Sequence, residues 1–154
     1  MSAKKSRQRP RPGDIVEIPF SDGRFGYGRV LSDPLMGFYE IHSSEPIPAD
    51  RIVQSKILFK IWVMNSAVTS GRWKIIGRSP IESDLQGSPW FFKQDIISKD
   101  LTLYREGQEK PGSVEQCKGL ERAAVWSAEH VESRLEDEID GRPNKWVEML
   151  RLEP

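Results

Sequence analysis

The stretch Gly13–Leu31, GDIVEIPFSDGRFGYGRVL, decides the fold. Two strand-like runs flank Ser21–Arg24, which contains an Asp-Gly pair. Such a pair is typical of a tight β-hairpin turn, because glycine readily takes the positive φ that the turn needs. In the first run Val16, Ile18 and Phe20 fall on one face, as a half-buried strand requires. The stretch therefore predicts a hairpin that opens a small antiparallel sheet.

The return strand of this hairpin carries glycine at two successive positions of one face, Gly26 and Gly28. Glycine weakens an ordinary strand, but it suits one that coils sharply or lets another backbone approach closely. We therefore expect a curved sheet.

Strand signals continue as far as Arg105, and the stretch EGQEKPGS that follows is expected to be a loop. The strands are short and regularly spaced, which favours a small barrel or a strongly bent sheet. The run ILFKIWVM is nearly all apolar and should be a central strand covered on both faces. After the hairpin we expect strands over Met36–His42, Ile57–Met64, Arg72–Gly77, Pro89–Lys93 and Leu101–Arg105.

The sequence changes character at residue 119, from which we predict one long helix over Gly119–Asp140. Residues 119–141 contain no proline, and Gly141 fits the position that follows a helix. The final segment, residues 142–152, is either an edge strand or a short helix, and its apolar spacing favours the helix. The core-facing stripe of the long helix would consist of Leu120, Ala124, Ser127, Ala128, Val131, Leu135 and Ile139.

These elements predict an α+β domain over residues 13–154. It would be a bent antiparallel sheet or a small β-barrel with one long C-terminal helix packed on it. A chain of 154 residues with 37% apolar residues suits a single domain with its own core. Residues 1–12 carry five basic and no acidic residues, and we expect them to be a disordered basic tail that can be deleted without loss.

The charge balance excludes a strong global attraction to nucleic acid or membranes, because 23 basic residues face 23 acidic ones. The charge is nevertheless segregated, with ten acidic against six basic residues over residues 115–154. The basic start is followed by no apolar segment, and no run approaches the roughly 18 apolar residues of a spanning helix. We therefore expect a cytoplasmic protein without membrane contact.

Few residues are placed for chemistry. The single cysteine, Cys117, excludes an intramolecular disulfide and a cysteine-rich zinc site, and His42 and His130 lack the spacing of a metal pair. The glycines of GRFGYG precede no Lys-Ser/Thr, so a phosphate loop is excluded. We predict no catalytic residue, no metal site and no small-molecule cofactor. A hydrolase built on a carboxylate pair stays open, since 23 acidic residues make chance pairs easy.

The helix side opposite the apolar stripe is the candidate binding surface. The segment from Glu129 to Asp140 contains six acidic residues and one basic residue. Trp126 falls on the same side, where it is either an interface anchor or covered by loops or the C-terminal segment. The acidic run is either a binding face or an ordinary solvated face. The predicted partner-binding residues are Trp126, Glu129, Ser133, Glu136, Asp137 and Asp140.

Several segments together resemble the bacterial immunity protein 26 family, over roughly residues 13–146. The resemblance implies a protein encoded beside a polymorphic toxin, which protects the producing cell and its kin by binding that toxin. It implies no catalytic residues, and the toxins of its members differ, so the binding residues above come from the helix pattern alone. The segments are Gly13-Asp14-Ile15, Ile18-Pro19, Asp22-Gly23-Arg24, Tyr27-Gly28-Arg29-Val30, Gly71-Arg72-Trp73, Ile76-Gly77, the run LERAAVWS from Leu120 to Ser127, His130-Val131-Glu132 and Arg134.

The favoured function is toxin immunity by direct, stoichiometric binding of a cognate toxin domain. A toxin that acts on nucleic acid presents a basic cleft, for which an acidic helical face is a decoy. The alternative is a nucleic-acid-binding small β-barrel module. It would use the basic head together with Trp62, Trp73 and Trp90, whose rings could stack on bases. Salt-dependent binding to generic DNA or RNA separates the two functions.

Overall fold

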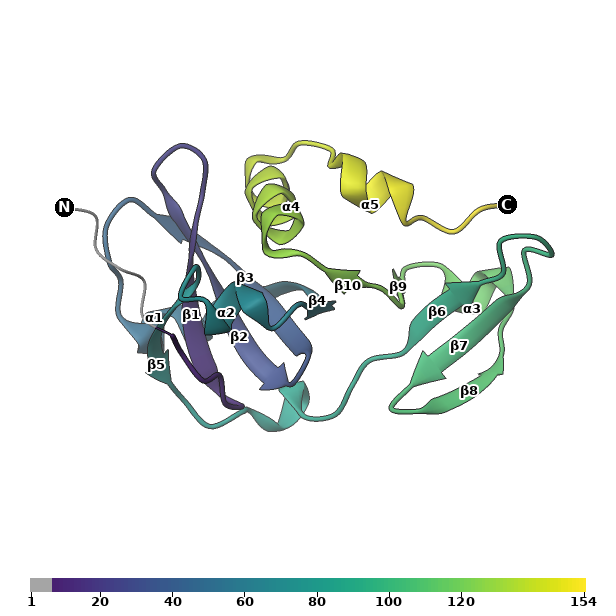
Figure 1. Cartoon of the computed structure of the whole chain (residues 1–154), viewed down its shortest axis with the longest axis horizontal. Coiled ribbons are helices and arrows are strands. Elements are labelled where there is room, and N and C mark those ends of the chain that lie inside the picture. Colours follow the sequence, from purple (N-terminus) through teal and green to yellow (C-terminus); the bar gives the residue numbers. More distant parts are fainter. Residues whose placement is uncertain (1–6) are drawn as a thin grey trace.

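The computed structural model describes residues 7–154 and contains two open sheets joined side by side (Figure 1). The first sheet has the strand order β10-β4-β3-β2-β1-β5 and the second has the order β8-β7-β6-β9. The predicted α+β class is therefore confirmed, with open sheets in place of the barrel alternative. The strands of the first sheet are β1 (Asp14–Pro19), β2 (Phe25–Ser32), β3 (Leu35–Ser43), β4 (Ile57–Val63), β5 (Lys74–Arg78) and β10 (Val125–Trp126). Those of the second sheet are β6 (Phe91–Gln94), β7 (Leu101–Arg105), β8 (Gln108–Pro111) and β9 (Glu121–Arg122).

The described part of the chain also contains five α-helices and one short 3-10 turn, and the last two helices follow all of the strands. The longest, α4, packs on the first sheet, as the sequence predicts for a C-terminal helix. The short helix α5 confirms the helical interpretation of residues 142–152. The helices are α1 (Ala49–Val53), α2 (Ser66–Thr69), α3 (Val114–Cys117), α4 (Ala128–Asp140) and α5 (Lys145–Met149), and the 3-10 turn η1 spans Ser83–Leu85.

The predicted hairpin is the pair β1–β2. The N–H of Phe20 donates to the carbonyl of Arg24 at 2.8 Å, and Gly23 takes a φ of 91° in the turn. Val16 and Ile18 are fully buried beneath α4, in one cluster with Val131 and Leu135 of that helix. The alternation of the first strand is thus confirmed, and it sets which face of the sheet receives the helix.

The opposite face of the first sheet is covered as well. Ile15, Tyr27 and Tyr39 form a second buried cluster there with Ile52 of α1. Alternate side chains of a strand point to opposite faces of the sheet. A strand that is buried on both faces therefore contributes to two separate cores. The sheet is therefore a layer between α1 on one side and α2 with α4 on the other.

Gly26 allows α4 to approach the sheet closely. A Cβ built at this position would lie 2.7 Å from Cδ2 of Leu135 and 2.6 Å from the ring of Phe20. Real Cβ atoms do not tolerate such distances, so any larger residue would push the helix or the hairpin outward. The sequence predicts a sharp coil or the close approach of another backbone at these glycines, whereas the atoms that approach Gly26 belong to the side chains of Phe20 and Leu135.

The prediction of a helix from Gly119 is wrong over its first turns. Residues 121–126 are extended: β9 pairs with β6 of the second sheet and β10 pairs with β4 of the first, both in parallel. The helix starts only after Ser127, whose hydroxyl accepts from the N–H of His130 as an N-cap. A Ser at this position favours a helix start, and it outweighs the apolar spacing that precedes it. One extended segment, Glu121–Trp126, therefore joins the two sheets.

The prediction for the stretch after Arg105 also needs correction. The expected loop after Arg105 contains β8, which pairs with β7 through a turn at Glu106 and Gly107, both with positive φ. Such a turn matches the twist of a two-residue hairpin. The predicted central strand is β4, which lies between β3 and β10 in the first sheet. It pairs with β3 along most of its length and with β10 only at Trp62 and Val63. The edge of β4 that faces away from β3 therefore has no strand partner over most of its length.

The N-terminal stretch for which a tail is predicted lies partly outside the described residues, which begin at residue 7. Within the described part, the side-chain amide of Gln8 donates to the carbonyls of Val68 at 2.9 Å and Trp73 at 2.7 Å. Its side-chain oxygen accepts from the N–H of Ile75 at 2.8 Å. We propose that the tail covers fewer residues than 1–12 and ends before Gln8.

Candidate partner-binding surface

Helix α4 carries most of the predicted binding residues, and both of its ends are capped. Ser127 caps its N-terminus, and Gly141 ends it with a left-handed φ of 73°. Glycine takes that conformation without steric cost, so the helix stops at a defined residue. Val131 and Leu135 are fully buried against the sheet, which fixes the orientation of the acidic side toward solvent and the β1–β2 hairpin.

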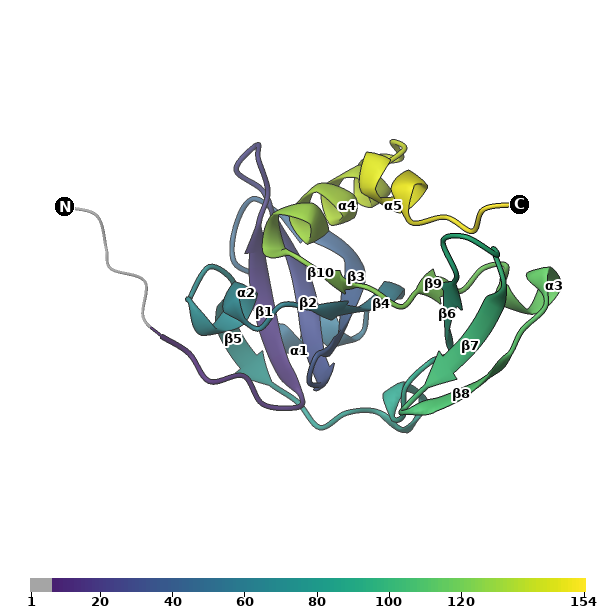
Figure 2. The same ribbon diagram turned by 45° about the vertical axis from the view of Figure 1, so that its right-hand side comes forward.

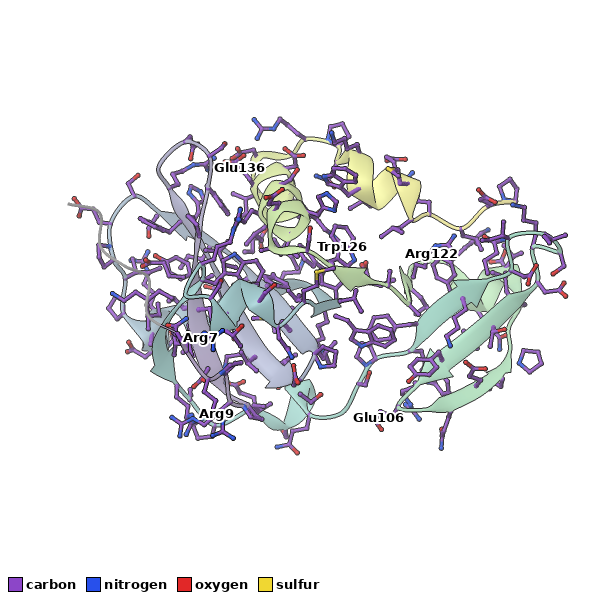
Figure 3. All side chains as sticks on the ribbon, in the orientation of Figure 1. Arg7, Arg9, Glu106, Arg122, Trp126 and Glu136 are labelled. Atoms are coloured by element: carbon purple, nitrogen blue, oxygen red, sulfur yellow. The ribbon has the colours of Figure 1, made fainter. Side chains whose placement is uncertain are left out.

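Trp126 does not lie on this helix. It is the second residue of β10, its side chain is 5% exposed, and it packs in the main core beneath α4 (Figure 3). The guanidinium of Arg134 lies 5.1 Å from the centre of its ring and 3.8 Å from that of Phe59. The predicted place of Trp126 on the acidic face is therefore wrong, and its covering by the rest of the chain is the alternative that the structure supports.

Glu136, labelled in Figure 3, and Asp140 bind the helix to the β1–β2 hairpin through hydrogen bonds. Oε1 of Glu136 accepts from the N–H of Ser21 at 3.0 Å and from its hydroxyl at 2.9 Å. The guanidinium of Arg24 donates to both oxygens of Asp140, at 3.0 and 2.8 Å, and its Nε donates to Asp22. These hydrogen bonds from Arg24 hold the pKa of the Asp140 carboxyl below its usual value.

Ser133 and Asp137 face the start of α5. Nδ2 of Asn144 donates to the hydroxyl of Ser133 at 3.0 Å and to the carboxylate of Asp137 at 2.9 Å. Asn144 also caps α5 by accepting from the N–H groups of Trp146 and Val147. Two of the predicted residues therefore fix how the chain leaves α4.

Glu132 is a residue that the helix pattern did not single out. Its Oε2 accepts from Nε of Arg72 and from the indole N–H of Trp73, both at 2.8 Å, and its Oε1 accepts from Nη2 of Arg72 at 2.7 Å. The same hydrogen bonds raise the pKa of Arg72. The Gly71-Arg72-Trp73 and His130-Val131-Glu132 segments of the resemblance thus meet in space, and no spacing in the sequence reveals that contact.

A groove of about 450 Å³ runs between the β1–β2 turn and the acidic side of α4. It brings together Glu129, Ser133 and Glu136 of the predicted residues and adds Glu132. Glu129 is the most exposed of these carboxylates, since 76% of its side chain is accessible to solvent. Its Oε1 lies 3.8 Å from Nη1 of Arg72. Asp137 and Asp140 do not line it. The groove is lined by Pro19, Phe20, Ser21, Glu129, Glu132, Ser133 and Glu136.

The tryptophans that could stack on bases lie against side chains of the chain itself. Trp73 is fully buried, and the ring of Trp62 lies 4.4 Å from Phe91 and 5.5 Å from Tyr104. Cationic groups of Arg105 and Lys110 lie 4.4 and 4.7 Å from the ring centre of Trp90. Free aromatic platforms are the feature that a stacking surface requires. The structure therefore adds no observation in favour of the nucleic-acid alternative.

No group of three or more His, Cys, Asp or Glu side chains is placed to hold a metal ion in residues 7–154. Within the same residues, none of the helices has the length and the apolar character needed to cross a bilayer.

Comparison with known proteins identifies the family. The model of the family described as immunity protein 26 matches residues 11–102, more than half of the chain. The match runs from the segment before β1 into β7, so α4 lies outside it. No curated protein and no solved structure shows significant similarity to the chain. The chain belongs to the immunity protein 26 family and is therefore an immunity protein of a toxin system.

Proposed function

We propose that the protein neutralises its cognate bacterial toxin by direct one-to-one binding in the cytosol. Inhibition of this kind needs no reaction chemistry, only a rigid surface complementary to the target in shape and charge. The observation that carries the proposal is the acidic groove between α4 and the β1–β2 turn. It combines a hollow of about 450 Å³ with carboxylates on a helix that is capped at both ends.

The groove is preorganised by the chain's own contacts. Ser21 holds Glu136, and Arg72 with Trp73 holds Glu132, so these carboxylates keep their positions before any partner arrives. Side chains that are already ordered lose little conformational entropy on binding. Glu129 is the exposed member at the rim, where a partner's cation can reach it.

A toxin that acts on nucleic acid fits this surface best. Enzymes that bind phosphate backbones do so with clustered Lys and Arg side chains. An acidic groove attracts such a cluster, and the attraction accelerates the encounter. We infer that the groove takes basic side chains from the substrate cleft of the toxin, which would exclude the toxin's own substrate.

Titration of toxin activity tests the mode of action. The toxin encoded beside this gene is mixed with increasing amounts of the purified protein, and its residual activity is measured after equilibration. Direct binding predicts a linear loss of activity that reaches zero at a molar ratio of one. Inactivation of many toxin molecules by one immunity protein would instead indicate an enzyme and overturn the proposal.

Charge reversal at the rim tests the surface. Glu129→Lys should slow association with the toxin about threefold or more at low salt and much less at 0.5 M salt, because screening weakens attraction between exposed charges. The matched control is Glu115→Lys on α3, whose side chain is 81% exposed and also lies near a basic residue. Equal association rates for the two variants would place the binding surface elsewhere.

A further inference from the structure

The loop between β6 and β7 displays two adjacent isoleucines to solvent. Ile96 is 86% exposed and Ile97 is 93% exposed, more than any other large apolar side chain in residues 7–154. Turn positions are usually polar, and two neighbouring exposed isoleucines contribute nothing to the core. Contiguous exposed apolar surface of this kind marks an interaction site more often than a scattered single residue does.

The turn that carries the isoleucines is held in one conformation. The carboxylate of Asp95 accepts from the N–H of Ile97 at 2.9 Å and from that of Ser98 at 2.8 Å, and these bonds lower its pKa. The N–H of Lys99 donates to the carbonyl of Asp95 at 3.0 Å, and Lys99 takes a left-handed φ of 65°. The apolar pair is therefore presented in a fixed geometry.

The C-terminal segment clamps the same loop. Gln94 and Glu153 exchange two hydrogen bonds, from the amide of Gln94 to the carbonyl of Glu153 at 2.8 Å and from the N–H of Glu153 back at 2.9 Å. Lys99 forms an ion pair with the carboxylate of Glu153. Contacts on both sides of the turn fix its position relative to the second sheet.

We propose that the loop Asp95–Asp100 is a docking element that inserts Ile96 and Ile97 into an apolar pocket of the toxin, with basic residues at the pocket's rim. This inference rests on the proposed function and names a second contact with the same partner. Preorganised apolar side chains give affinity because little ordering remains to be done on binding. The basic rim follows from the surroundings of the pair, where Asp95, Asp100 and Glu153 outnumber Lys99 and Arg122.

The position of the loop suits a partner that also covers the groove. Figures 1 and 2 show the β1–β2 turn and the β6–β7 loop on the same upper side of the molecule, with α4 and α5 between them. A protein lying across α4 and α5 would meet the acidic groove at one end and the apolar pair at the other. Two separated contacts fix the orientation of a partner better than one does.

The test removes the apolar pair without touching the core. The double change Ile96→Ser with Ile97→Ser should leave the melting temperature unchanged, because both side chains are exposed. It should accelerate dissociation from a catalytically inactive form of the toxin encoded beside this gene by about tenfold or more. The control is Val114→Ser on α3, an exposed apolar residue (47%) far from the loop in the sequence, which should leave dissociation unchanged.

A second variant tests the fixed geometry. Asp95→Ala keeps both isoleucines but removes the hydrogen bonds that shape the turn, so it should weaken binding by a smaller factor than the double change. Unchanged kinetics for the double variant, with normal binding of the unaltered protein, overturns this inference and leaves the proposed function intact. Absence of toxin binding by the unaltered protein overturns both. Self-association that the double change abolishes would assign the loop to a second copy and overturn the inference.

Discussion

At the scale of single residues, Glu132 is the group on which two distant segments depend. It accepts three hydrogen bonds from Arg72 and Trp73, and the indole of Trp73 is fully buried. A buried donor that loses its acceptor costs more free energy than the hydrogen bond contributes. The carboxylate therefore matters to folding before it matters to any partner.

Removal of the Glu132 carboxylate should lower the stability of the protein. Glu132→Ala leaves the indole N–H of Trp73 without its partner, and we expect the free energy of unfolding to fall by about 2 kcal/mol. Glu138→Ala, an exposed position on the same helix, is the control and should stay within about 0.5 kcal/mol of the unaltered protein. Urea unfolding of the three proteins measures the difference, and equal stabilities would mean that the contact with Trp73 is not maintained in solution.

Asp140 gives the protein a predictable response to acid. The hydrogen bonds from Arg24 lower its pKa below the ordinary value of 3.8, so folding favours the ionised form. Its contribution to stability is complete well above pH 3.8 and is lost as the pH falls through the lower pKa of the folded state. Asp140→Asn should therefore flatten the fall of the melting temperature below about pH 4.

The control for this acid response removes Arg24, which donates to the Asp140 carboxylate. In a chain that carries Arg24→Ala, the further change Asp140→Asn should alter the pH dependence much less, because the main hydrogen-bond donor is already gone. The same flattening in both backgrounds would show that Arg24 does not determine the titration. Thermal unfolding between pH 2 and pH 6 provides the comparison.

At the scale of elements, the β1–β2 hairpin and the end of α4 at Gly141 were more predictable than the segment between the sheets. The β1–β2 turn follows from local chemistry, since Asp-Gly at the turn acts within a few residues. The extended segment Glu121–Trp126 depends on partners far away in the sequence, β6 and β4, which override local helical spacing. Ser127 was the available signal, because a serine followed by an amphipathic run is a helix start.

Trp126 should act through stability. Trp126→Ala removes a buried ring from the main core and should cost about 3–5 kcal/mol, seen as a lower melting temperature. Val125→Ala, its exposed neighbour in β10, should change stability little. A Trp126→Ala protein that melts normally but releases the toxin faster would return this residue to the interface.

The candidate site was recovered from the sequence only in part. The acidic side of α4 is present, and three predicted residues, Glu129, Ser133 and Glu136, line one groove. The pattern could not show that Arg24, Arg72 and Arg142 form ion pairs with Asp140, Glu132 and Asp137, because these arginines come from other segments. Helical spacing predicts on which side of the helix a residue lies, but its contacts with other segments depend on the tertiary fold.

At the scale of the whole molecule, the N-terminal stretch can be divided by deletion. Removal of residues 1–6 should leave the melting temperature and toxin neutralisation unchanged, because this segment is basic and offers little apolar surface to bury. Removal of residues 1–12 should lower the melting temperature, since it also deletes Gln8 and its hydrogen bonds to Val68, Trp73 and Ile75. Gln8→Ala in the full chain should reproduce part of that loss.

The outcome separates two roles of the same stretch. Equal melting temperatures for both deletions would mean that Gln8 contributes nothing to the folded state. Loss of neutralisation on deletion of residues 1–6, at unchanged stability, would assign the basic residues Lys4 and Lys5 to contact with the toxin or with nucleic acid.

The segment Glu121–Trp126 also sets the order in which the molecule can be completed during synthesis. It supplies the outermost strand of each sheet, β9 beside β6 and β10 beside β4, and it follows all other strands in the chain. On the ribosome, β6 and the end of β4 therefore wait with open edges until residue 126 has emerged. Open edges recruit strands from other chains. A nascent chain stalled just before Glu121 would thus be the form of this protein most prone to aggregate.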